Sequence, residues 1–165
     1  MILLADNNSS APKILCGRGL EDTAHWLRAA GYDVCLPLMP MSDIQLYNIA
    51  LNENRVLIIN ENQINQIPQN SKIVLSLNSS LVFEQIKQIG QHLNINWTYR
   101  PLSRCMICNT ELSPLNINQW IDLPESIQAQ TVTSHGCPDC KRIYWAGEEI
   151  DRMVYQLESF NSIDW

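Results

Sequence analysis

Four cysteines in two CxxC pairs are the residues of this chain whose types and spacing point most clearly to chemistry. Cys105 and Cys108 form the first pair, and Cys137 and Cys140 form the second. Two thiolates separated by two residues on a tight turn can point at one ion, and a second such turn completes a tetrahedral set of four sulfurs, which suits zinc. Because such a site leaves no open coordination position, we expect Zn²⁺ to stabilise the fold and to take no part in a reaction.

The surroundings of the two pairs fit this interpretation. Asn109 follows the first pair and accepts the left-handed conformation that a metal knuckle needs, and Pro138 stiffens the second. The pairs are separated by 28 residues, more than the roughly 15–20 that are usual, so the predicted zinc ribbon needs a longer loop between its halves. The alternatives are a disulfide pairing or free thiols. Cys16 and Cys35 lie in apolar contexts, and we expect both to be small buried side chains.

The charge balance argues against a general nucleic-acid binder. The net charge is −6, and residues 101–165 hold 4 of the 11 basic and 9 of the 17 acidic side chains. Binding to phosphates requires clustered Lys and Arg. The two knuckles would bring together one small basic group, which is therefore the candidate nucleic-acid-binding patch: Arg100, Arg104, Lys141 and Arg142. The alternative is an ordinary solvated surface.

Nothing in the sequence indicates a membrane protein or a secreted one. No apolar run approaches the ~20 residues of a membrane span. The apolar start, residues 1–5, is too short for a signal peptide and lacks a basic beginning. Because CxxC pairs without a signal sequence are typical of a reducing compartment, we expect a cytoplasmic protein.

The elements that would position these residues alternate along the chain. Apolar runs predict strands over 13–16, 33–38, 55–59 and 72–77, and helical spacing predicts helices over 20–30, 42–52, 81–93 and 150–160. This alternation predicts an α/β fold with a parallel sheet and right-handed crossovers, in which function gathers at the carboxyl ends of the strands. We therefore divide the chain into an N-terminal arm or extra strand (1–12), an α/β domain (13–100), and a zinc ribbon with a closing helix (101–165).

Local sequence signals indicate where two helices begin or end and which side chains face the core. Residues 42–45 form a capping box that opens the second helix, and Gly31 is placed to end the first as a C-cap glycine. We expect Leu51 and Phe83 to face the core from the second and third helices, and Trp145 to pack between the ribbon and the sheet.

The order of these pieces resembles the PIN-like ribonuclease family named for the C-terminal domain of the Mut-seven exonuclease. Four segments carry the likeness: PKILCGRGLEDTAHWLRAAGYDV from Pro12, SDIQLYNIALNENRVLIINEN from Ser42, SRCMICNTEL from Ser103 and CPDCKRIYWAG from Cys137. In the first segment the matching residues are Trp26, Leu27, Arg28, Gly31, Tyr32 and Asp33. The resemblance implies a PIN-like three-layer domain with a parallel sheet, followed by a four-Cys zinc ribbon and a C-terminal helix.

The resemblance also implies where a nuclease of this kind would act. PIN-type nucleases collect carboxylates at the strand ends to hold one or two Mg²⁺ or Mn²⁺ ions, which generate the attacking hydroxide. Where the family has its strand-end acids, this chain reads Gly17-Arg18, Asn60-Glu61 and Asn78-Ser79-Ser80. The candidate catalytic residues are therefore the acids that remain near the expected site, Asp43 and Glu61. Further candidates are Glu53, Glu21, Asp22 and, as a substitute from the N-terminal arm, Asp6.

Two functions follow from these observations. The first is a degenerate family member that keeps the fold and the zinc and binds RNA or a protein partner, with Arg104, Lys141 and Arg142 as the nucleic-acid-binding candidates. The second is an active Mg²⁺- or Mn²⁺-dependent ribonuclease that uses Glu61 and Asp43. The substituted strand ends favour the first. Each of the two acids also has an alternative role without catalysis. Asp43 would be a carboxylate that stabilises the N-terminus of a helix, and Glu61 would be a solvated loop acid.

Overall fold

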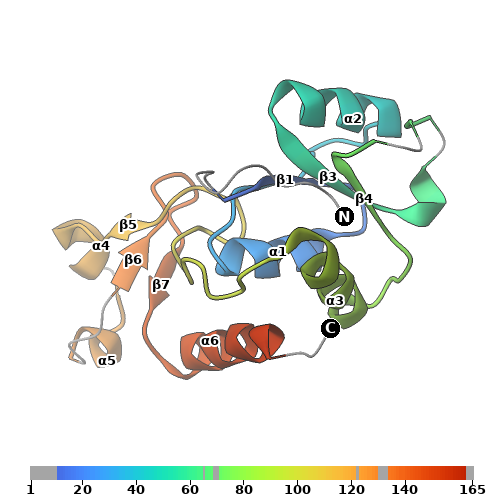
Figure 1. Cartoon of the computed structure of the whole chain (residues 1–165). Coiled ribbons are helices and arrows are strands. Elements are labelled where there is room, and N and C mark those ends of the chain that lie inside the picture. The colour runs from blue at the N-terminus through green and yellow to red at the C-terminus, as the bar shows by residue number, and fades with distance from the viewer. Residues whose placement is uncertain (1–10, 65, 69–70, 122, 130–133, 163–165) are drawn as a thin grey trace.

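A parallel sheet of four strands forms the centre of the chain, as Figure 1 shows in a computed structural model that describes residues 11–64, 66–68, 71–121, 123–129 and 134–162. The strands lie in the order β2-β1-β3-β4, and every neighbouring pair is parallel. Their bounds are Lys13–Cys16 for β1, Val34–Cys35 for β2, Arg55–Asn60 for β3 and Val74–Leu77 for β4. The predicted α/β class with a parallel sheet is confirmed.

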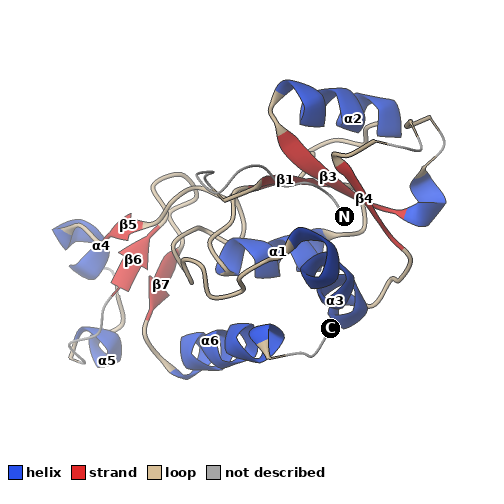
Figure 2. Cartoon of the chain, in the orientation of Figure 1, coloured by secondary structure: helices blue, strands red, loops and turns tan. Residues whose placement is uncertain are grey.

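Helices cover both faces of this sheet (Figure 2). Helices α1 (Glu21–Ala29) and α3 (Val82–Leu93) pack on one face, and α2 (Asp43–Asn52) packs on the other. Residues of β3 alternate between the two layers: Val56 and Ile58 join α1 and α3, whereas Leu57 and Ile59 join α2. A strand buried on both faces needs apolar side chains at every position, which explains the continuous apolar run of β3.

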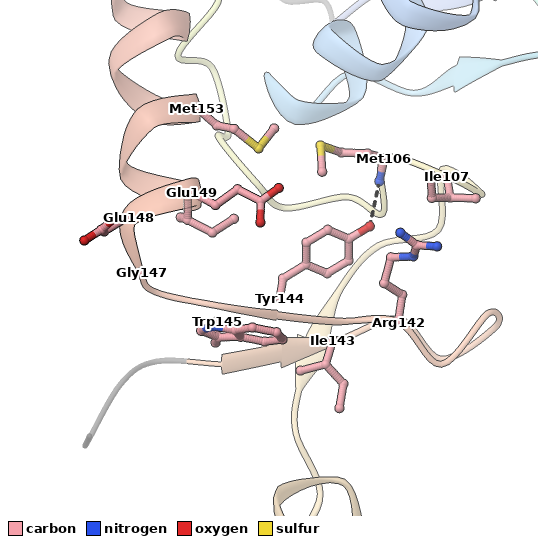
Figure 3. A pocket seen from close by; sticks show the side chains of 11 residues that line it. Met106, Ile107, Arg142, Ile143, Tyr144, Trp145, Gly147, Glu148, Glu149 and Met153 are labelled. Atoms are coloured by element: carbon pink, nitrogen blue, oxygen red, sulfur yellow. Dashed lines mark hydrogen bonds between the residues drawn. The ribbon is translucent and has the colours of Figure 1, made fainter. Parts of the chain in front are cut away.

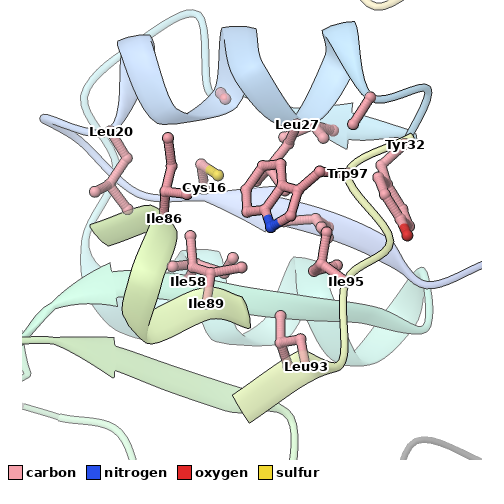
Figure 4. Packing of buried hydrophobic residues seen from close by; sticks show 14 of the residues in the cluster. Cys16, Leu20, Leu27, Tyr32, Ile58, Ile86, Ile89, Leu93, Ile95 and Trp97 are labelled. Carbon is pink, nitrogen blue, oxygen red and sulfur yellow. The ribbon is translucent and has the colours of Figure 1, made fainter. Parts of the chain in front are cut away.

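The layer that α1 and α3 cover is the larger one (Figure 4). It also includes residues from segments that follow α3 in the chain. Trp97, from the segment after α3, is fully buried in it. Helix α6 (Glu148–Asn161) adds Leu157 and Phe160 to the same layer. The Phe160 ring meets Trp26 and Trp97 edge-on, with centroids 5.2 and 5.3 Å apart. The closing helix therefore packs on the α/β core.

The local signals of the sequence are partly confirmed. Ser42 and Gln45 form the predicted capping box, and Gly31 ends α1 with a left-handed φ of 98°. Three burial predictions are wrong, because Leu51, Phe83 and Trp145 are 47, 50 and 38% exposed. Strand β2 is also shorter than predicted and ends at Cys35, because the residues that follow, 36–41, form a proline-rich loop.

The ribbon is a small antiparallel sheet in the order β5-β6-β7. Its strands are β5 (Ser113–Pro114), β6 (Ser134–Gly136) and β7 (Ile143–Trp145). The long connection between β5 and β6 holds two short helices, α4 (Ile117–Ile121) and α5 (Glu125–Gln128), which is the longer loop that the spacing of the cysteines predicted.

Two predictions concern the limits of the domains and the start of the chain. Residues 1–10, which include Asp6, lie outside the described residues, so the predicted arm and its substitute acid remain predictions. The boundaries at residues 13 and 101 also remain predictions. Among the helices that the structure describes, none combines the length and the apolar character needed to cross a bilayer.

Candidate metal centre and strand-end site

The four cysteines come together at the junction of the ribbon with the α/β core. Their Sγ atoms all lie within 4.8 Å of one another. Cys105 Sγ is 3.6 Å from Cys140 Sγ, and Cys108 Sγ is 3.2 Å from Cys137 Sγ. Tetrahedral coordination with Zn–S bonds of about 2.3 Å places the sulfurs roughly 3.8 Å apart. Four cysteines are thus close enough to hold one metal ion, and this donor set fits zinc.

The two knuckles have the same backbone geometry, which explains why both present their thiols to one point. In the first, the Cys105 amide donates to Thr110 O (2.8 Å) and the Asn109 amide donates to Cys105 O (2.9 Å). In the second, the Cys137 amide donates to Arg142 O (2.8 Å) and the Lys141 amide donates to Cys137 O (3.1 Å). Asn109 and Lys141 have φ angles of 69° and 62°. The left-handed conformation predicted for Asn109 is therefore confirmed, and Lys141 shares it.

As free thiols, these side chains differ strongly in acidity. Burial alone would raise the pKa of Cys108, but hydrogen bonds with Thr110 outweigh it and lower the pKa to about 6. Burial raises the pKa of Cys137 to about 12, and its hydrogen bond with Cys108 adds to this effect. Four thiols this close share their protons, whereas a bound divalent cation takes them all as thiolates.

Tyr144, on β7, connects this centre to its surroundings, and sequence reasoning did not single it out. Its hydroxyl lies 3.2 Å from Cys105 Sγ and accepts a hydrogen bond of 3.2 Å from the Met106 amide (Figure 3). Burial, and then the contact with Cys105, raise the pKa of Tyr144 above its usual value, so the hydroxyl keeps its proton. Tyr144 thereby fixes the first knuckle against β7.

The family-like segment at the end of α1 holds the first knuckle to the sheet. Arg28 is buried and donates to Met106 O (2.9 Å), to Ile107 O (2.7 Å) and twice to Val34 O (2.9 and 2.8 Å). Asn109 adds a second link, since its Oδ1 accepts from the Val34 amide (2.9 Å) and its Nδ2 donates to Asp33 Oδ1 (2.8 Å). Two of the matching residues of this segment, Arg28 and Asp33, thus attach the ribbon to the sheet.

The carboxyl ends of the strands form a separate and mostly uncharged edge. Gly17 follows β1, Asn60 ends β3, and residues 78–80 follow β4. A pocket of about 340 Å³ opens at the ends of β3 and β4, and Glu61 is its one carboxylate among the described residues that line it. Asn60 Oδ1 is buried and has no hydrogen-bond partner in the described part of the chain.

The two candidate catalytic acids have different places in the fold. Glu61 is exposed beside the strand-end pocket, whereas Asp43 is half-buried in the first turn of α2 and does not line that pocket. Within the described ranges, the four cysteines are the one group of three or more His, Cys, Asp or Glu side chains whose ligand atoms are close enough for a common ion. Among the described residues, the strand ends thus present no such cluster for Mg²⁺ or Mn²⁺, and a catalytic role for Asp43 and Glu61 remains a prediction.

The four residues of the candidate basic patch make contacts with different parts of the chain. Arg104 donates to Glu111 (3.1 Å) and to Asn109 O (2.9 Å), and Arg100 pairs with the same Glu111 at 3.4 Å. Lys141 Nζ donates to Pro138 O of its own knuckle. Arg142 is exposed and lines a pocket between the first knuckle, β7 and the start of α6. A nucleic-acid role for Arg104, Lys141 and Arg142 remains a prediction.

A comparison with known families identifies the chain. The model of the Mut7-C RNase domain matches residues 12–157, which include the whole parallel sheet, both knuckles and most of α6.

The chain belongs to the Mut7-C RNase domain family.

No curated protein and no solved structure matches the chain. The predicted family is thereby confirmed, and it has two consequences for this Mut7-C chain. The four-Cys centre is an integral part of the matched region, because both knuckles fall inside it. The strand-end edge falls inside it as well, so the uncharged residues at Gly17, Asn60 and Asn78 stand within a recognisable Mut7-C sheet.

Proposed function

We propose that this chain is a non-catalytic member of the Mut7-C RNase family, a protein whose ribbon is held by a structural zinc ion and which binds RNA or a protein partner. The geometry around Gly17 supports this most strongly. A Cβ atom at this position would lie 2.8 Å from Ile59 Cγ2, closer than real Cβ contacts come. The end of β1 therefore lacks an acid, and any side chain at position 17 would require Ile59 to shift.

The neighbouring strand ends support the same conclusion. Asn60 and Asn78 offer amides where a metal-dependent nuclease needs carboxylates. The metal in such an enzyme both makes the nucleophile and holds the substrate, so replacing its ligands removes most of the rate. In contrast, the contacts of Arg28 and Asn109 that attach the ribbon to the sheet are present. The part of the fold that supports binding is retained, and the part that supports hydrolysis is not.

One observation favours the second candidate, an Mg²⁺- or Mn²⁺-dependent ribonuclease. Glu61 lines the strand-end pocket together with Asn60 and Asn62, and carboxylate and amide oxygens are ligands that these ions accept. Asp43 would have to supply a further oxygen from the start of α2. This alternative is weaker because it requires Asp43 to move to a pocket that it does not line.

A cleavage assay separates the two candidates. Single-stranded and structured RNA are incubated with purified protein and Mn²⁺, and the wild type is compared with Glu61→Gln and Asp43→Asn. We expect no cleavage above the protein-free background for any of the three. Cleavage by the wild type that either substitution abolishes would establish the ribonuclease in place of the binding protein.

The charge of the chain and its cysteines support a proposal about the kind of partner and the cellular compartment. The acidic balance of residues 101–165 favours a protein partner over bulk nucleic acid. The structure forms no disulfide among the six cysteines, and a four-thiolate zinc centre persists most readily in a reducing compartment such as the cytoplasm.

A further inference from the structure

A mostly apolar groove runs between the first knuckle, β7 and the start of α6 (Figure 3). Its first part has a volume of about 290 Å³, and a more open second part of about 440 Å³ continues toward α1. Met106, Glu149 and Met153 line both parts, which makes them one continuous depression. The first part lies at the lower end of the roughly 300–1,000 Å³ of small-ligand pockets, so it admits a single long side chain.

The walls of this groove are suited to a side chain that is apolar along its length. Trp145 is 38% exposed, and its indole lies against Gly147, where a Cβ atom would be 3.6 Å from the ring. Tyr144 forms the adjoining wall and is held there through its hydroxyl. The thioethers of Met106 and Met153 are adaptable surfaces of the kind that accommodate different partners.

The charges around the groove are predominantly negative. Asp22, Glu148 and Glu149 line its two parts, against one guanidinium, that of Arg142. The carboxylates of Asp22 and Glu149 make no hydrogen bond or ion pair with any part of the chain that the structure describes. His25 also lines the second part, and burial lowers its pKa, so that it stays neutral and does not offset the acids.

We propose that this groove binds an arginine or lysine side chain presented by an extended basic segment of a protein partner. The aliphatic stem would lie along Met106 and Met153, and the cation would reach the Trp145 face and the Glu149 carboxylate. The net charge of −6 adds long-range attraction for a basic partner. This inference rests on the proposed function as a binding protein and specifies its partner.

The test uses full-length zinc-loaded protein and short peptides with a single central Arg, Lys, Leu or Glu in a Gly/Ser background. Binding is followed by NMR through the Trp145 indole NH and the methyl groups of Met106 and Met153. We expect the Arg and Lys peptides to shift these signals and the Leu and Glu peptides to leave them in place. Equal shifts with all four peptides, or no shift with any, would overturn the proposal.

Three variants test the geometry. Glu149→Gln should weaken binding of the Arg peptide about tenfold, whereas Glu158→Gln, an equal charge change on the exposed side of α6, should leave it within twofold. Trp145→Ala should weaken it roughly threefold to tenfold. Zinc content and circular dichroism show that each variant is folded. Equal effects of Glu149→Gln and Glu158→Gln would contradict a specific site.

Arg142→Gln decides between a basic peptide and RNA. Because Arg142 repels a cationic ligand, its removal should strengthen binding of the Arg peptide about twofold to threefold. A single-stranded RNA oligonucleotide that shifts the same signals, and binds more weakly to Arg142→Gln, would replace the proposal with an RNA interface. If no peptide binds to the folded protein, the groove is not a binding site for basic side chains. This result would leave the question of catalysis open, because the cleavage assay measures catalysis separately.

Discussion

Arg28 shows how a single side chain connects the two parts of this molecule. The residue is 3% exposed, and its guanidinium donates hydrogen bonds to the carbonyls of Met106, Ile107 and Val34. Three carbonyls at these positions need a planar donor with several N–H groups, which Arg offers and Lys does not. The positive charge also lies next to a centre that carries two net negative charges when four thiolates hold one divalent ion.

We predict that Arg28→Ala lowers the free energy of unfolding by about 3 kcal/mol, because it removes the donors of the buried Val34 carbonyl and of the partly buried carbonyls of Met106 and Ile107. Arg28→Lys should recover about half of this loss. Urea denaturation measures both, and Arg152→Ala, an exposed arginine of α6, is the control with an expected change under about 0.5 kcal/mol. A loss of less than 0.5 kcal/mol for Arg28→Ala would contradict this role.

Asp33 gives a pH-dependent contribution at the same junction. Burial alone would raise the pKa of its carboxyl, but the hydrogen bonds from Arg55 and Asn109 outweigh burial and hold the pKa below its usual range. A carboxyl whose pKa is lower in the folded state stabilises the fold above its unfolded pKa of about 3.9, and this contribution is lost as the pH falls through the folded value.

Asp33→Asn should therefore cost about 2 kcal/mol at neutral pH, and the difference from the wild type should shrink below about pH 4. Denaturation curves of both proteins at matched pH values measure it. Acid loss of zinc affects both alike and cancels in the difference. A difference that stays constant from pH 7 to pH 3 would show that the ionised carboxylate is not the stabilising form.

At the scale of elements, the end of α1 and the start of the ribbon fit each other closely. Gly31 leaves the helix in a left-handed conformation, and the linker between α3 and the ribbon passes directly against it at Arg100. The Arg100 and Leu102 amides donate to Ala30 O and Ala29 O, at 3.0 and 2.7 Å, so the linker caps the helix. A Cβ atom on Gly31 would lie 2.4 Å from Arg100 O.

Gly31→Ala should accordingly destabilise the protein by about 3 kcal/mol or more, from the strained φ and from the forced displacement of the linker. Gly147→Ala is the matched control, because that residue is extended and a Cβ atom there meets nothing closer than 3.6 Å. We expect it to cost less than about 1 kcal/mol. Thermal unfolding of the two variants compares them, and equal melting temperatures would refute the close approach.

The elements were predictable from sequence where one signal dominated. The apolar run of β3 and the capping box of α2 determined their elements without help from the rest of the fold. The burial of Leu51 and Phe83 was mispredicted. Helix α3 buries Ile86, Ile89 and Leu93, but Phe83 lies in its first turn and Leu51 lies in the last turn of α2, and both side chains stay about half exposed. The long-range contacts of Arg28, Tyr144 and Asn109 join residues about 40 to 80 positions apart, and no local pattern signals them.

At the scale of the whole molecule, the chain combines a Mut7-C sheet and ribbon with a strand-end pocket in which Glu61 is the one carboxylate among the described lining residues. The four cysteines were predictable, because their spacing alone specifies the chemistry. The properties of the strand-end site could be predicted only in part from the sequence. The sequence shows Gly17 in place of an acid, but the obstruction by Ile59 depends on the packing of two strands.

The four-Cys centre makes a direct prediction about composition. Metal analysis of protein purified under reducing conditions should find one zinc per chain, because four thiolates complete a closed tetrahedral site. Cys105→Ser or Cys137→Ser, at the two buried ligands, should lower zinc content to below half and expose the ribbon to proteolysis. Protein with reduced thiols and no metal would contradict the zinc assignment.

Manganese binding tests the central claim most directly, because it reports on the strand-end site independently of any ribonuclease contaminant. Mn²⁺ broadens the NMR signals of nearby nuclei, and the backbone amides of Asn60, Glu61 and Asn78 lie at the site in question. With zinc-loaded protein we predict no selective broadening of these three signals at Mn²⁺ concentrations up to about 1 mM. Selective broadening that saturates below this concentration and disappears in Glu61→Gln would contradict a non-catalytic Mut7-C protein.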